Sequence, residues 1–98
     1  MQMFTIVSTT DWVNVNRRIQ HIKTGHPDRE IILDHFDEMT AHAIGQLNAK
    51  YPTIRGVNPK WIDENTYQFT IERLDADTGE WYADKVRTLQ IVEAELKF

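Results

Sequence analysis

Two short apolar runs rich in β-branched residues constrain the fold of this chain most strongly. They are MFTIV at residues 3–7 and REIILD at residues 29–34. Runs of this length are typical of buried strands. Between them, residues 11–24 repeat their apolar side chains at helical spacing. The residues on the apolar side of that segment are Trp12, Val15, Ile19 and Ile22. A strand, a helix and a second strand predict a parallel βαβ unit with a right-handed crossover.

The second half of the chain changes from a helical pattern to strand patterns. Residues 35–49 are expected to form a second helix, which Pro52 ends because the residue before a proline disfavours α conformation. Residues 66–74 alternate apolar and polar side chains, and a return strand at 80–94 follows the loop DADTG, which predicts an antiparallel hairpin. The expected fold is one α+β domain over residues 1–98, in the order β-α-β-α-β-β-β. Its mixed sheet would combine an N-terminal βαβ unit with a C-terminal antiparallel hairpin or meander.

Composition excludes several classes of function. Cysteine is absent, which excludes disulfides, thiolate metal sites and thiol nucleophiles. The formal charge is −4 and is unevenly spread, because residues 1–27 carry three basic residues and one acidic residue while the remainder is acidic. Such a surface disfavours binding to a phosphate backbone and suits a basic protein partner. The N-terminus has no basic leader and no long apolar run, so we expect a cytoplasmic protein without a membrane segment.

The densest cluster of chemically active side chains is DHFDEMTAHA at residues 34–43. On a helix, His35, Glu38 and His42 would share a stripe opposite the apolar side, and that stripe is the solvent face. A metal site usually needs a partly dry pocket with ligands from more than one element. We therefore expect no resident metal or cofactor and interpret Asp34 as the N-cap of the helix. An enzyme or a metal-binding protein that uses Asp34, His35, Glu38 and His42 is the alternative hypothesis.

A second alternative is a nucleic-acid-binding protein. Arg17, Arg18 and His21 would lie together on the solvent side of the first predicted helix. Three such groups are few for a nucleic-acid surface, and most of the remaining chain is acidic. A solvated helix face is the simpler interpretation.

The acidic loop between the last two strands is the third candidate. Asp75, Asp77 and Gly79 resemble part of a calcium loop, but their spacing is not that of an EF-hand and the flanking elements are strands. A hairpin turn with Gly79 at positive φ accounts for them. The exposed carboxylates Asp75, Asp77 and Glu80 would then be available to a partner.

The sequence as a whole favours a small acidic binding module without enzymatic activity. By composition it matches protein-binding inhibitors, immunity proteins and accessory factors of the kind found in phage and plasmid systems. We expect a protein partner, more plausibly basic than acidic. Nucleic acid is not the expected ligand, and the sequence leaves association with a second copy open.

Overall fold

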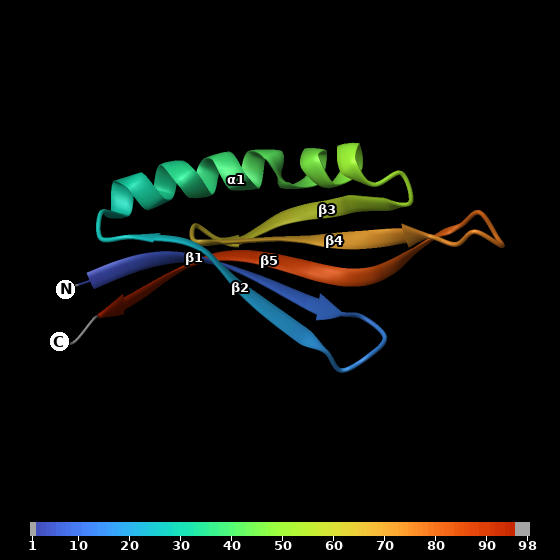
Figure 1. Cartoon of the computed structure of the whole chain (residues 1–98), viewed down its shortest axis with the longest axis horizontal. Coiled ribbons are helices and arrows are strands. Elements are labelled where there is room, and N and C mark those ends of the chain that lie inside the picture. Colours follow the sequence, from blue (N-terminus) through green and yellow to red (C-terminus); the bar gives the residue numbers. More distant parts are fainter. Residues whose placement is uncertain (1, 96–98) are drawn as a thin grey trace.

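The structure, a computed structural model that describes residues 2–95, is a five-stranded antiparallel sheet with one helix on one face (Figure 1). In chain order its elements are β1 (Gln2–Trp12), β2 (Arg18–His26), α1 (Arg29–Lys50), β3 (Ile54–Asp63), β4 (Thr66–Leu74) and β5 (Trp81–Glu95). The strands lie in the order β2-β1-β5-β4-β3, and every neighbouring pair is antiparallel. A helix on one face of an antiparallel sheet is an α+β arrangement.

The predicted β-α-β-α-β-β-β order is wrong. The described chain runs β-β-α-β-β-β, with no parallel pair of strands and hence no βαβ unit. Two segments have a different secondary structure from the predicted one. The first predicted helix, residues 11–24, contains the hairpin turn and most of β2, and the second predicted strand, residues 29–34, is the first part of α1.

Strand β2 forms because β1 needs a partner on that edge. Eight residues of β1, from Phe4 to Asp11, pair with β2, which satisfies backbone groups that a helix would have left open. The helical stripe inferred from the sequence is not buried in the structure. Val15 is 58% exposed and Ile22 is 77% exposed, so their spacing reflects no packed helix face.

Helix α1 begins six residues earlier than predicted because its cap is Asp28 and not Asp34. The backbone N–H of Glu30 donates to the Asp28 carboxylate at 2.9 Å. Within the helix, Ile32, Phe36 and Thr40 recur every four residues and all three are buried. The neighbouring Ile31 is 39% exposed, so the isoleucine pair follows the helical period.

The antiparallel pairing of β4 with β5 is confirmed. Tyr67 lies opposite Leu89 and Phe69 opposite Arg87, and the pairing continues outward to Leu74 and Trp81. The predicted loop closes this hairpin, with Gly79 at φ 71°. Alternation of apolar and polar residues therefore identified this strand correctly, because one face of β4 packs in the core and the other face is polar.

The core lies between α1 and the facing side of the sheet. It consists of Phe4, Ile6, Ile32, Phe36, Tyr67, Phe69, Ile71 and Leu89. Trp61 of β3 extends it, with its ring centroid 5.8 Å from that of Phe36 and 5.1 Å from that of Tyr67. In the described part of the chain no helix is both long and apolar enough to cross a bilayer.

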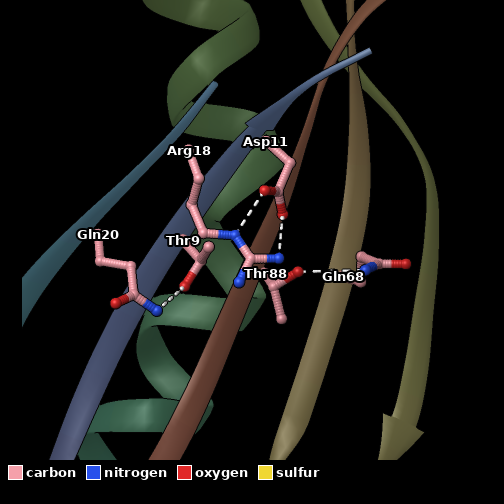
Figure 2. Close-up of polar contacts among 6 residues, drawn as sticks. All are labelled: Thr9, Asp11, Arg18, Gln20, Gln68 and Thr88. Carbon is pink, nitrogen blue, oxygen red and sulfur yellow. Dashed lines mark hydrogen bonds and ion pairs between the residues drawn. The ribbon is translucent and has the colours of Figure 1, made fainter. Parts of the chain in front are cut away.

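The opposite face of the sheet carries polar cross-strand contacts (Figure 2). Gln20 donates to Thr9 at 3.2 Å across the β2–β1 pair, and Gln68 donates to Thr88 at 3.1 Å across the β4–β5 pair. Such ladders of amides and hydroxyls suit a sheet face that meets water.

Candidate binding groove

A groove lies between α1 and the strands β2, β1 and β5. The helix packs most closely over β3, while the β1–β2 hairpin diverges from it (Figure 1). Two adjoining cavities, each of about 390 Å³, open along the strip of sheet left uncovered. Both are lined by Ser8, Lys23 and Arg87, so they form one continuous depression.

Strand alternation builds the floor of this groove. Every second residue of β1 from Phe4 to Thr10 faces the helix side and is buried. Ser8 lies between His21 of β2 and Leu89 of β5 in the pairing register. Cross-strand neighbours share a face of the sheet, so hydroxyl, imidazole and apolar side chains meet there.

Arg87 is the central cation of the groove. It lies opposite Thr10, and its Nε donates to the Thr10 hydroxyl at 3.3 Å. In the part of the chain that the structure describes, Arg87 forms no ion pair with a carboxylate. Burial lowers the pKa of the Arg87 guanidinium, against a smaller opposing influence of Tyr51, yet an arginine side chain remains charged in proteins. A partly desolvated cation without a carboxylate favours binding of an external anion.

Lys23, His21 and Lys85 surround Arg87 at the same end of the groove. The cavity at this end is lined by Ser8, Thr10, Trp12, Ile19, His21, Lys23, Lys85 and Arg87. None of these side chains is acidic, although the whole protein has a net charge of −4. We call this set the cationic end of the groove.

Lys85 is held in place by two neighbours. Its Nζ lies 3.0 Å from the carboxylate of Asp84 and 5.3 Å from the ring centroid of Trp12. Burial alone would raise the pKa of Asp84, but hydrogen bonds and charge attraction from Lys85 and Arg73 together hold it below its usual range. Asp84 lines neither cavity, so its charge fixes Lys85 from outside the groove.

The other end of the groove is more apolar. Met39 and Ala43 of α1 form one wall, and Phe69 and Leu89 of the sheet form the floor. Polar side chains on the helix form the rim, namely His35, Glu38, His42 and Gln46. We call this the apolar end of the groove. The groove thus places a cationic region next to a more apolar one.

The metal-ligand candidates are placed on this rim. His35, Glu38 and His42 are exposed, as expected for the solvent face of the helix, and they line the rim of the apolar end. Asp34 is exposed within α1 and lines neither cavity. Among residues 2–95 the structure brings no three His, Asp or Glu side chains into an arrangement that could hold a metal ion.

The three residues of the predicted basic helix face lie at different places in the β1–β2 hairpin. Arg17 is in the turn, with its guanidinium carbon 4.6 Å above the Trp12 ring. Arg18 is on the polar sheet face, where its Nε donates to Asp11 at 2.7 Å (Figure 2). Only His21 lines the groove.

The acidic loop lies at the tip of the β4–β5 hairpin. The Asp75 carboxylate accepts backbone N–H groups of Asp77 and Thr78 at 2.8 Å and 3.3 Å, so it shapes the turn. Asp77 and Glu80 are exposed. The loop therefore presents two free-standing acidic side chains and no cavity in the described structure.

Sequence reasoning missed the groove residues Ser8, Thr10, Lys23, Lys85 and Arg87. A usable signal was present in β5, where Lys85, Arg87 and Leu89 alternate with Val86 and Thr88. Two cations on the side of a strand that also carries core residues indicate a sheet face that is only partly covered. Without the strand order, their proximity to β1 could not be inferred.

Comparison with protein-family models, with characterised proteins and with solved structures finds no match for this chain. A functional proposal therefore rests on the groove itself.

Proposed function

We propose that the protein is a non-enzymatic binding module, of the inhibitor or accessory-factor type, which takes an acidic segment of a partner protein into the groove. The observation that carries the proposal is the cationic end. Three lysine and arginine side chains and no carboxylate line this cavity, in a protein of net charge −4, and within residues 2–95 only Lys85 of the three is paired with a carboxylate, that of Asp84 outside the cavity. Complementary charge both steers and orients a partner. We also propose that the protein is cytoplasmic, as expected from the sequence.

The concave shape of the groove favours this surface over the acidic hairpin tip. A segment that enters a groove buries more of its surface than one that touches a loop tip. The floor residues Ser8 and Thr10 are 4% and 7% exposed and belong to β1, which has a paired strand on either side, so the floor of the site is formed before binding. A preorganised site loses less entropy when it binds.

We propose binding rather than catalysis because the lysine and arginine side chains of the groove supply positive charge to a ligand. A hydroxyl nucleophile needs a hydrogen-bonded base, which a third group orients. Ser8 and His21 are cross-strand neighbours, but no hydrogen bond joins a histidine ring to a hydroxyl or a carboxylate anywhere in residues 2–95. The groove side chains are better suited to holding a charge than to moving a proton.

A selection from a random peptide library tests the proposal. Wild-type protein should enrich peptides rich in Asp and Glu. The double variant Lys23→Gln/Arg87→Gln should bind them at least about 100-fold more weakly, because it loses two charge-assisted hydrogen bonds of about 1.5–3 kcal/mol each. The matched control is Arg18→Gln/Lys60→Gln, which removes the same charge from β2 and β3 outside the groove and should bind normally.

Two results would contradict the proposal. Enriched peptides could be basic and bind through Asp77 and Glu80, which would favour the partner expected from the overall charge. Alternatively, acidic peptides could bind both double variants equally, which would show that the groove cations do not contact them. Thermal melts of all variants establish that each is folded before affinities are compared.

A further inference from the structure

We propose that the cationic end of the groove is a site for a phosphoryl group, carried by a phosphorylated side chain of the bound segment. This inference rests on the proposed function and specifies the chemistry that the groove selects. It follows from the orientation of Arg87, from the number of donors around it and from the apolar end beside it.

The first observation is how Arg87 is held. Its Nε is already used by the Thr10 hydroxyl at 3.3 Å, which fixes the guanidinium from one side. The two terminal nitrogens remain as a planar pair of donors, and this fork matches two oxygens of a phosphoryl group. A fixed fork selects by geometry as well as by charge.

The second observation is the number of donors. Lys23 and His21 line the same cavity as Arg87, and the Ser8 hydroxyl is part of its floor. A carboxylate has two oxygens and one negative charge, whereas a phosphoryl group offers three oxygens and a charge of about −1.5 to −2 at neutral pH. Several cations and a hydroxyl that line one cavity therefore suit the phosphoryl group better.

The third observation distinguishes a protein segment from a nucleic acid. A strand of nucleic acid places phosphates along its whole length, so its binding groove carries cations along that length. Here Lys85 lies at the cationic end, and Lys23 and Arg87 lie where the two ends meet. Among residues 2–95 no further lysine or arginine lines the apolar end, whose rim carries Glu38 beside Met39 and Ala43. A peptide with an apolar residue next to a phosphorylated one fits both ends.

The first experiment uses inorganic phosphate as the probe. In a titration followed by backbone amide NMR at constant ionic strength, phosphate should give saturable shifts at Ser8, Thr10 and Arg87, while acetate should give weaker ones. Arg87→Lys keeps the charge but removes the fork and should weaken phosphate binding about tenfold, because bidentate pairing is lost. Arg18→Gln, which lies on the opposite sheet face, should leave it unchanged.

The second experiment compares peptides obtained from the library selection. Each is synthesised with glutamate, serine or phosphoserine at the position that contacts Arg87. The phosphoserine form should bind at least about tenfold more tightly than the glutamate form, a ratio that corresponds to about 1.4 kcal/mol. A single-stranded oligonucleotide of similar length serves as the competing ligand.

The outcomes separate this inference from the proposed function. Equal binding of phosphoserine and glutamate peptides overturns the phosphoryl site and leaves the acidic-segment groove standing. Phosphate that binds at Arg87 while no peptide does overturns the proposed function and identifies a small-anion site. An oligonucleotide that binds more tightly than the phosphopeptide, and depends on Arg87, shows that the occupant is a nucleic acid.

Discussion

Ile32→Ala should lower the free energy of unfolding by about 2–5 kcal/mol, the usual cost of removing a buried large aliphatic side chain. Ile32 is fully buried between α1 and the sheet, at 0% exposure. Domains of this kind are stable by only about 5–15 kcal/mol, so the change should be visible as a large drop in the urea midpoint.

The chain provides a matched control at the preceding residue. Ile31→Ala removes the same atoms from a side chain that is 39% exposed and should cost less than about 1 kcal/mol, because surface substitutions are usually mild. Equal losses for the two isoleucines would contradict the burial of Ile32, and not of Ile31, against the sheet.

Gly56→Ala should destabilise the protein by about 1–3 kcal/mol through overpacking. Gly56 is buried in β3 directly under the helix, and a Cβ there would lie 2.9 Å from Cγ1 of Ile44. Its backbone N–H also donates to the Asn48 side chain at 2.9 Å, which ties the strand to α1. The added methyl group must therefore push the helix and the strand apart.

A double-mutant cycle isolates this contact. An Ile44→Ala background removes Cγ1, the nearest clashing atom, and Cγ2, so Gly56→Ala should cost much less there, which appears as a coupling energy. Gly45→Ala is the control, since its new Cβ would meet nothing within 4 Å and alanine favours a helix by about 0.5–1 kcal/mol over glycine. Destabilisation by Gly45→Ala, or none by Gly56→Ala, would contradict this packing.

The fold could be predicted from the sequence where the spacing of apolar residues matched a strand and did not match a helix. The alternation over β4 does not fit a helix, and it correctly predicted the antiparallel pairing of β4 with β5. The segment over residues 11–24, which contains the end of β1, the hairpin turn and most of β2, was ambiguous because its four apolar residues matched helical spacing by position. What decided its structure was the unpaired edge of β1, a tertiary requirement that no local pattern contains.

The start of α1 was misassigned for a different reason. Residues 29–34 are rich in isoleucine and leucine, which suits a strand as an isolated run. The capping residue Asp28 and the four-residue spacing from Ile32 to Phe36 and Thr40 were both legible in the sequence. They were outweighed by the β-branched composition of the run.

The groove could be anticipated only in part. His21, His35, Glu38 and His42 were all singled out from the sequence, and all line the groove. Their grouping was different, because His21 was assigned to a basic helix face and the others to the metal-ligand candidates of a second helix. Arg87 and Thr10 meet across 77 residues of sequence, and only the antiparallel pairing of β1 with β5 brings them together.

The most direct test reverses the charge at Arg87 and, separately, the charges of the peptide that it would contact. Acidic peptides from the library selection, and the same peptides with each Asp and Glu replaced by Lys, would be titrated against wild-type protein and against Arg87→Glu by calorimetry. Wild type should prefer the acidic form by at least about tenfold, as one strong charge pair allows, and Arg87→Glu should prefer the lysine form. If Arg87→Glu is folded and still prefers the acidic peptides as wild type does, the groove is not where this protein binds its partner.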